Sequence, residues 1–217
     1  MNEILQSFGI SGVSEIYKIG NGHINKAYHI KSNSGEYILQ NINKNIFKNP
    51  ESVMKNISAV CKMFYESSIS VPEYLSADGR NFVVSDGEYW RMYRFIGDSE
   101  TSEIKDKNRA YGKVYGEFIR TVNYKKFKPE TTIENFHNFG AYLNRLNLAV
   151  SGNYLKKIDS GVMMRLRNLR DTLNHVFSAD FPKRIIHGDA KKDNISIDVL
   201  LSLHFRIERV RSWHDTR

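Results

Sequence analysis

The chain has 217 residues, of which 41% are hydrophobic and 12% aromatic, so it can form a packed core and is not a disordered chain. The formal net charge of +8 favours anionic partners, from phosphate esters to nucleic acid, but does not choose among them. The single cysteine, Cys61, excludes an internal disulfide and a multi-cysteine metal site. No apolar run is long enough to span a membrane, and the N-terminus lacks the basic and then apolar residues of a secretory signal peptide. We therefore expect a cytoplasmic protein without a membrane partner.

Three predicted strands open the chain and form a meander, over 13–19, 27–31 and 36–40. A polar loop with two glycines, 20–25, joins the first two, and a turn at 32–35 joins the next two. Alternating apolar and polar residues with turn signals between them are typical of antiparallel strands. The first part of the chain is therefore expected to form a sheet.

A helix with a clear start follows these strands. Asn49 suits its N-cap and Pro50 its first position, and apolar residues then recur at helical spacing as far as Phe64. A short strand is predicted over 71–75. Beyond it, 82–84 and 89–93 flank an Asp-Gly pair that favours a tight hairpin.

After Ile96 the pattern changes to helices, and this change is the expected lobe boundary, between 1–96 and 97–217. Three apolar stripes mark them: Ala110, Val114 and Phe118; Phe136, Phe139, Leu143 and Leu146; and Val162, Leu166, Leu169, Leu173 and Val176. The last stripe covers barely two heptads, so we interpret it as a core-facing helix rather than a coiled coil.

The segment 184–197 carries the sharpest chemical pattern. Apolar residues lead into His187-Gly188-Asp189, and Asn194 follows Asp189 by five positions. Phosphoryl transfer needs a carboxylate that orients and accepts the proton of the attacking hydroxyl, and an amide oxygen that holds a magnesium ion on the nucleotide phosphates. An aspartate is a weak base at neutral pH, so its main contribution is to position the nucleophile.

This pattern resembles the catalytic loop of the aminoglycoside phosphotransferase and choline kinase type enzymes, relatives of the protein kinases. The segments 20–25, 37–43, 47–51, 89–93 and 135–137 are similar to the branch that contains the N-acetylhexosamine 1-kinases. The likeness runs in the family's order from about Val13 to Asp198. It implies an α+β, bilobal, protein-kinase-like fold with a strand-rich N-lobe and an incomplete helical C-lobe, and it implies ATP and Mg²⁺ as cofactors.

The resemblance also assigns roles to individual residues. Asp189 is the expected base and Asn194 the magnesium ligand, and His187 and Lys192 support the catalytic loop. The remaining candidates are nucleotide-binding: Gly20, Asn21, Gly22, His23 and Asn25 in the phosphate loop, Gln40 on the third strand, and Arg94, Phe95 and Ile96 in the hinge, through their backbone.

Some of these assignments have plain structural alternatives. The 20–25 loop, taken alone, is also typical of an ordinary hairpin turn. Gln40 stands where protein kinases carry a phosphate-binding lysine, but it is neutral, and a surface strand residue is the competing interpretation. Glu51 lacks a lysine partner and is not assigned the role of the kinase helix glutamate. Cys61 lies in a helical apolar stripe and is expected to be buried.

The family pattern breaks after Asp198. The second metal ligand of such kinases is an aspartate at the end of an apolar strand, and neither Asp198 nor Asp215 occupies such a place. Residues 201–207 alternate as in a half-buried strand but supply no aspartate. We therefore expect a truncated or frameshifted C-terminal lobe, with uncovered apolar helix faces and weakened metal binding.

The expected function is ATP-dependent phosphorylation of a hydroxyl on a small molecule in carbohydrate metabolism, with an N-acetylhexosamine as the first candidate substrate. The alternative is a catalytically impaired or dead kinase fragment that at most binds nucleotide or a partner. Nucleic-acid binding ranks last because no RNA-recognition signature is present. The sequence says nothing about oligomeric state.

Overall fold

The computed structural model describes residues 1–20, 24–65, 71–96, 107–125, 127–136, 138–151, 159–178, 184–190, 195–197, 203–205 and 211–212. They form two compact units, Met1–Ile133 with Ile185–Arg211, and Glu134–Arg184 with Ser212–Arg217. The boundary at Ile96 falls inside the first unit, at the end of its sheet, and it stays a prediction about lobes.

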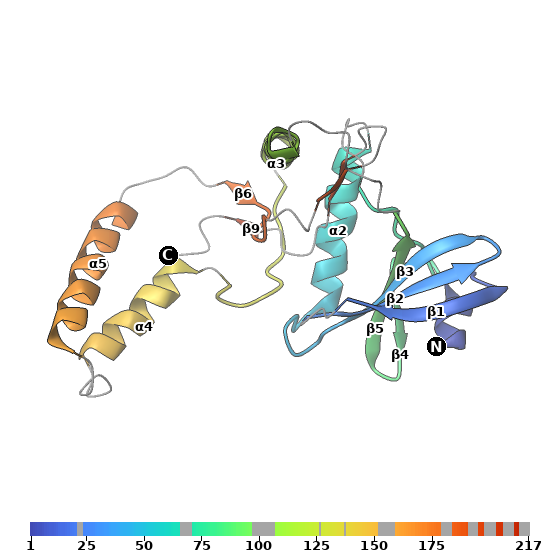
Figure 1. The fold of residues 1–217 in the computed structure, drawn as a ribbon, viewed down its shortest axis with the longest axis horizontal. Coiled ribbons are helices and arrows are strands. Elements are labelled where there is room, and N and C mark those ends of the chain that lie inside the picture. The colour runs from blue at the N-terminus through green and yellow to red at the C-terminus, as the bar shows by residue number, and fades with distance from the viewer. Residues whose placement is uncertain are drawn as a thin grey trace. The chain divides into compact units, whose positions relative to one another are not determined.

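A five-stranded antiparallel sheet forms the N-terminal part of the first unit (Figure 1). Its strands are β1 (Val13–Ile19), β2 (Lys26–Ser32), β3 (Gly35–Ile42), β4 (Val83–Ser85) and β5 (Glu88–Arg94), in the order β1-β2-β3-β5-β4. The predicted hairpin between β4 and β5 is confirmed. Asp86 and Gly87 both have positive φ, 52° and 69°, as a two-residue turn between twisted strands requires.

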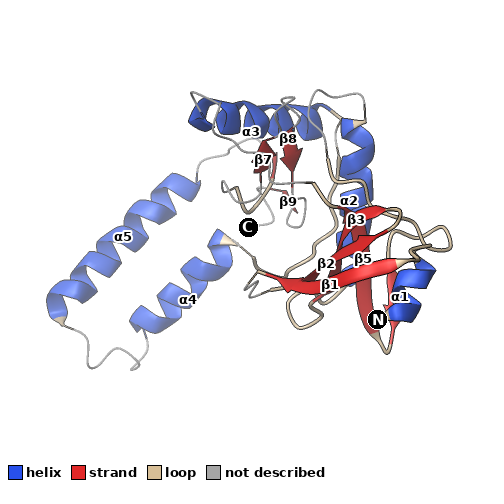
Figure 2. Cartoon of the chain, turned by 45° about the vertical axis from the view of Figure 1, so that its right-hand side comes forward, coloured by secondary structure: helices blue, strands red, loops and turns tan. Residues whose placement is uncertain are grey.

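The two faces of the sheet are covered by different helices because strand side chains alternate between faces. α1 (Asn2–Ser7) packs through Ile4 and Leu5 against the face that carries Tyr37, Leu39 and Met92 (Figure 2). α2 (Pro50–Phe64) packs on the other face, where Ile42 joins its core cluster. Gln40 and Ile38 share that second face with Ile42.

α2 begins where the sequence predicts. The Asn49 Oδ1 accepts a hydrogen bond from the Ser52 amide at 3.2 Å, and Pro50 is the first helical residue. The helix is also tied to the chain that follows α3 (Lys107–Tyr124). The Asn56 carboxamide donates to the Glu130 carbonyl and accepts from the Glu130 amide, each at 2.8 Å, and Ser52 donates to the Glu130 carboxylate.

The strand predicted over 71–75 is wrong. The structure has only an isolated bridge there, between Tyr74 and Tyr93, with the Leu75 amide donating to the Met92 carbonyl at 2.8 Å. Pro72 has no N–H to donate to a ladder, so apolar composition alone does not make a paired strand of this segment.

The first unit also contains α3 (Lys107–Tyr124), which packs on α2 through Phe118, stacked on Phe64 with ring centroids 5.9 Å apart. Four short strands come from the end of the chain: β6 (Ile185–Ile186), β7 (Ile195–Ile197), β8 (Leu203–Phe205) and β9 (Arg211–Ser212). β6 pairs with β9, and β7 pairs antiparallel with β8. The alternation expected over 201–207 therefore contains a short paired strand.

The second unit contains α4 (Phe139–Ser151) and α5 (Ser160–Ser178). The expectation that the α5 stripe faces a core is wrong, because Val162 and Leu169 are 39% and 50% exposed. Leu148 of α4 is 71% exposed, and the described residues of this unit include none that is buried. Two helices can bury one seam between them, but not the whole of their apolar faces. Across the described residues, no helix is both long and apolar enough to cross a membrane.

Candidate active site

The segment predicted to be catalytic is described over 184–190 and 195–197, and its first part is held on α3 by one carboxamide. The Asn123 Oδ1 accepts from the Ile185 amide at 2.8 Å, and its Nδ2 donates to the Ile185 carbonyl at 3.0 Å. Ile185 itself is buried in the core cluster of α2 and α3. β6 is only two residues long, so this two-way clamp and the burial of Ile185 fix where the segment begins its turn.

The turn that follows places His187 inside and Asp189 near the surface. His187 is 3% exposed and meets the rings of Tyr115 and Phe118 edge-on, at 6.0 and 5.6 Å between centroids. The Asp189 amide donates to the His187 Nδ1 at 3.3 Å. Gly188, between them, has φ of 76°, where a side chain is strained. The imidazole thus packs and shapes the turn, and the Asp189 carboxyl side chain is half-buried.

Gln40 is buried on the α2 face of the sheet, directly across from Arg91 of β5. The Arg91 Nε and Nη2 both donate to the Gln40 Oε1, at 2.9 and 2.7 Å. Arg91 is 1% exposed, and its guanidinium lies 5.7 Å from the centroid of the Tyr74 ring. The neutral glutamine thus holds a buried cation.

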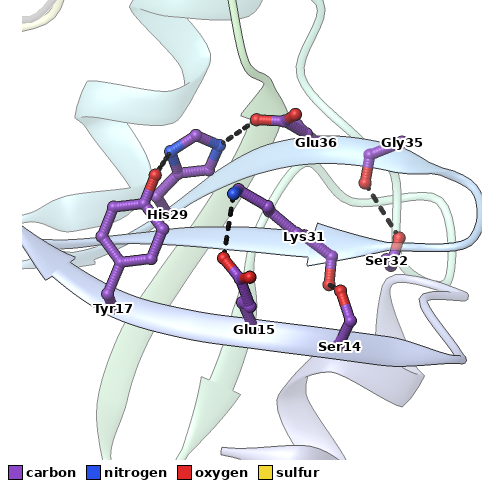
Figure 3. A network of polar contacts seen from close by, with 8 residues as sticks. All are labelled: Ser14, Glu15, Tyr17, His29, Lys31, Ser32, Gly35 and Glu36. Carbon is purple, nitrogen blue, oxygen red and sulfur yellow. Dashed lines mark hydrogen bonds and ion pairs between the residues drawn. The ribbon is translucent and has the colours of Figure 1, made fainter.

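A second buried polar residue, His29 of β2, lies on the same face, two positions further along the ladder of β2 and β3, where it pairs with Ile38. The Tyr17 hydroxyl is 2.5 Å from the His29 Nδ1, and the His29 Nε2 is 2.6 Å from the Glu36 carboxylate (Figure 3). The His29 ring also packs on Phe95, with centroids 4.1 Å apart. This network links β1, β2 and β3 to Phe95, the first residue after β5.

The other nucleotide-binding candidates have mixed placements. Gly20 is exposed at the end of β1 with φ of 66°. The Asn25 Oδ1 accepts from the Asn43 amide at 3.0 Å, so it ties the loop to the end of β3.

In the segment predicted as the hinge, two backbone amides already have partners. The Phe95 amide donates to the Glu36 carbonyl at 2.9 Å, and the Arg94 amide donates to the Glu73 carbonyl at 3.2 Å. Those two amides are thus engaged within the sheet region.

Five predicted site residues lie outside the described residues: Asn21, Gly22, His23, Lys192 and Asn194. Of the segment expected to hold magnesium, the structure therefore describes Asp189 but not Asn194. The described residues contain no cluster of three or more metal-ligating side chains. Glu51 is exposed in the first turn of α2.

Sequence reasoning missed Arg91, Asn123 and His29. A partial signal existed for Arg91, because period-two alternation places it on one face with Tyr89 and Tyr93, where a charge is unusual. Its partner could not be predicted, since nothing local pairs β5 with β3. Asn123 and His29 act through contacts 62 and 12 residues away along the chain, and neither belongs to a motif.

No protein-family model matches the sequence. Among solved structures, the chain is similar to the aminoglycoside phosphotransferase APH(4)-Ia, with a TM-score of 0.61 and 12% identity over 97% of this chain and 71% of that chain. An aminoglycoside phosphotransferase from Alicyclobacillus acidocaldarius gives 0.61 and 10%, over 98% and 67%. Spectinomycin phosphotransferase APH(9)-Ia, solved with ADP and spectinomycin, gives 0.54 and 14%, over 97% and 68%. At such identities the likeness concerns the fold, and the chain has the kinase-like α+β fold of the aminoglycoside phosphotransferases.

Proposed function

We propose that this chain is an ATP-dependent phosphotransferase that acts on a hydroxyl group of a small molecule. The observation that carries the proposal is the His187-Gly188-Asp189 turn, fixed on α3 by Asn123 and shaped by the His187 ring. It presents one half-buried carboxylate from the same compact unit that contains the five-stranded sheet. The fold likeness supports the same reading, because its members include proteins solved with ADP or with the ATP analogue AMP-PNP.

In the proposed reaction, the Asp189 carboxylate accepts a hydrogen bond from the acceptor hydroxyl and orients its oxygen toward the terminal phosphate. The proton moves to Asp189 as the new P–O bond forms and the bond to ADP breaks. The hydrogen bond from the Asp189 amide to the His187 Nδ1 fixes the backbone at Asp189, and so the place from which its carboxylate extends. His187 is a positioning residue in this scheme.

A nucleoside triphosphate such as ATP binds together with Mg²⁺, and the bound ion would neutralise charge on the phosphates. A carboxamide oxygen is a ligand that Mg²⁺ accepts, so Asn194 fits the ion by its chemistry. Asn194 is the proposed magnesium ligand. The loop residues Gly20 to Asn25, with Lys192 and the backbone at Ile96, are proposed to hold the nucleotide.

The proposed substrate class is an amino sugar, phosphorylated at its anomeric hydroxyl, with N-acetylglucosamine and N-acetylgalactosamine as the compounds to test first. Support for this finer assignment comes from the segments 37–43 and 89–93, which resemble the N-acetylhexosamine 1-kinase branch. Both segments form the paired strands β3 and β5 at the centre of the sheet.

The test is turnover of Mg-ATP with each amino sugar, compared between the wild type and Asp189→Ala. We expect the variant to lose roughly 10²- to 10⁴-fold in kcat, the range of a positioned base, while it still gains thermal stability from Mg-ATP. Asp171→Ala is the matched control, since Asp171 is an exposed carboxylate of α5 paired with Arg170, and we expect it to keep full activity.

A wild type that binds Mg-ATP but turns over no hydroxylated acceptor would reject the enzyme in favour of a non-catalytic nucleotide-binding protein. A wild type that binds no nucleotide would reject both the phosphotransferase and the nucleotide-binding protein. The sequence feature that motivates this second candidate is the lack of an aspartate in the strand pattern over 201–207, since Asp198 stands only four residues after Asn194.

A further inference from the structure

Three polar side chains, one from each of β1, β2 and β3, form a line from a phenol to a carboxylate (Figure 3). Tyr17 of β1 pairs directly with His29 of β2, and its hydroxyl lies 2.5 Å from the His29 Nδ1. The other ring nitrogen, Nε2, lies 2.6 Å from the Glu36 carboxylate of β3. The strands thus bring a hydroxyl, an imidazole and a carboxylate together in that order.

The carboxylate determines which ring nitrogen can act as a base. An ionised carboxylate only accepts hydrogen bonds, so the proton of a neutral His29 ring belongs on Nε2, the nitrogen that faces Glu36. Nδ1 then carries the lone pair and can accept the proton of the Tyr17 hydroxyl. In this arrangement an imidazole draws the proton from a nucleophilic hydroxyl, while the carboxylate orients the ring.

Solvent exposure makes His29 an enclosed base and Tyr17 an accessible nucleophile. His29 is 5% exposed, and its ring packs on Tyr17 and Phe95, with centroids 4.9 and 4.1 Å away. Tyr17 is 43% exposed on the edge strand β1, so a reagent can reach its side chain from solvent. A base that is held in place beside an accessible hydroxyl is already oriented for proton transfer.

We propose that Tyr17 is an activated nucleophile that takes an acyl group from an activated acyl donor, such as a thioester or an acyl phosphate. The Tyr17 oxygen attacks the carbonyl carbon while its proton moves to the His29 Nδ1. The bond from that carbon to the leaving group breaks, the leaving group departs with the bonding electron pair, and His29 returns the proton to it. The product is a phenyl ester at Tyr17, and Glu36 is a positioning residue that acts through the His29 ring.

Acyl transfer fits these groups better than phosphoryl transfer does. A hydroxyl, an imidazole and a carboxylate in this order activate the nucleophile of acyl-transfer enzymes. A phosphoryl donor would place several anionic oxygens beside the Glu36 carboxylate, and its transfer depends on metal ions or cationic side chains. Acylation of Tyr17 is therefore independent of the proposed phosphotransferase activity.

The test is acetylation by N-acetylimidazole, a small acyl donor that reacts with tyrosines, with peptide mass spectrometry to give the rate at each tyrosine. Tyr65 is the internal reference because it is 90% exposed, against 43% for Tyr17. We expect Tyr17 to react at least about tenfold faster than Tyr65 despite its lower exposure, since a positioned base contributes roughly 10²- to 10⁴-fold. If exposure alone set the rate, Tyr65 would react faster.

Two variants test the base and the carboxylate separately. His29→Gln keeps a hydrogen-bonding side chain but removes the base, and we expect it to lower the Tyr17 rate at least about tenfold with no change at Tyr65. Glu36→Gln removes only a charge at an exposed position, and we expect a smaller loss at Tyr17. Glu15→Gln is the matched control and should keep the wild-type rate, because Glu15 is an exposed β1 carboxylate whose ion pair is with Lys31.

Thermal unfolding shows which variants are folded, and Glu36→Gln keeps the test decisive if His29→Gln does not fold. Tyr17 reacting no faster than Tyr65 in the wild type would overturn the inference. An unchanged Tyr17 rate in folded His29→Gln, or in folded Glu36→Gln, would overturn it as well. A purely structural network would change the melting temperature in these variants without a selective change in the rate at Tyr17.

Discussion

At the scale of single residues, Cys61 shows how partial burial controls reactivity, because it is half-buried against the core of α2 and α3 rather than fully buried as expected. Burial raises the pKa of the Cys61 thiol to about 12, and the positive charge of Arg91 offsets only part of this rise. We predict that iodoacetamide labels the native protein roughly 10- to 100-fold more slowly than the unfolded chain at about pH 8. The thiolate fraction falls by about three orders of magnitude, and the greater nucleophilicity of a high-pKa thiolate restores part of the rate.

The measurement is clean because the chain has one cysteine. Mass spectrometry of samples labelled with and without urea gives both rates directly. Equal rates in the two conditions would contradict the placement of Cys61 beneath the Pro72 carbonyl, which its Sγ approaches at 3.9 Å.

The sequence predicted the surroundings of some residues and not of others. Asn49 was predicted as a cap and is one, because capping depends on residues within one helical turn. For Gln40 the sequence left a surface residue and a phosphate ligand as alternatives. Its burial against Arg91, 51 positions away along the chain, excludes the surface interpretation. Side-chain pairs between distant strands have no local signal in the sequence.

At the scale of elements, the placement of β6 depends on α3 through Asn123. We predict that Asn123→Ala lowers the free energy of unfolding by about 1–3 kcal/mol, because the buried amide and carbonyl of Ile185 lose their partners. Chemical denaturation measures this loss, and faster hydrogen exchange at the Ile185 amide locates it in the segment before Asp189.

The same substitution at Asn168 serves as the control. Asn168 is exposed on α5, and alanine is the better helix former, so we expect stability to stay the same or rise by about 0.5 kcal/mol. If Asn123→Ala behaves like Asn168→Ala, the clamp does not position β6.

Elements with strong local signals were predicted well, and those that depend on tertiary contacts were not. The meander and the Asp86-Gly87 hairpin follow from alternation and turn chemistry. α1 was not predicted, because it is six residues long without a side-chain cap and is stabilised by burying Ile4 and Leu5. The α5 stripe was assigned to a core that the described residues do not provide, since periodicity marks an apolar face without saying what covers it.

At the scale of the whole molecule, the formal net charge of +8 makes the carboxylates that hold the sheet and α2 to other segments important for stability in acid. Glu88 joins the β4–β5 hairpin to the chain after β3, with its carboxylate 2.9 Å from the Lys44 Nζ, and this hydrogen bond lowers the pKa of Glu88. At the other site, the Ser52 hydroxyl, followed by Lys55, lowers the pKa of Glu130. Both contacts join segments distant in sequence, so protonation loosens the tertiary structure rather than one helix.

The direction of the pH effect follows from these lowered pKa values. Since the unfolded carboxyls take up protons at a higher pH than the folded ones, the stabilisation is fully present above the ordinary glutamate pKa of 4.5 and is lost as pH falls through the folded values. We predict that the double variant Glu88→Gln with Glu130→Gln is less stable than the wild type at neutral pH but loses less stability between about pH 5 and pH 3.

Urea midpoints across this pH range measure how steeply stability falls, with Glu134→Gln, at an exposed position, as the control. Salt should reduce the difference at neutral pH, because both carboxylates are solvent-accessible and their lysine contacts are screened. Parallel pH profiles for the double variant and the wild type would show that these two carboxylates do not set acid stability.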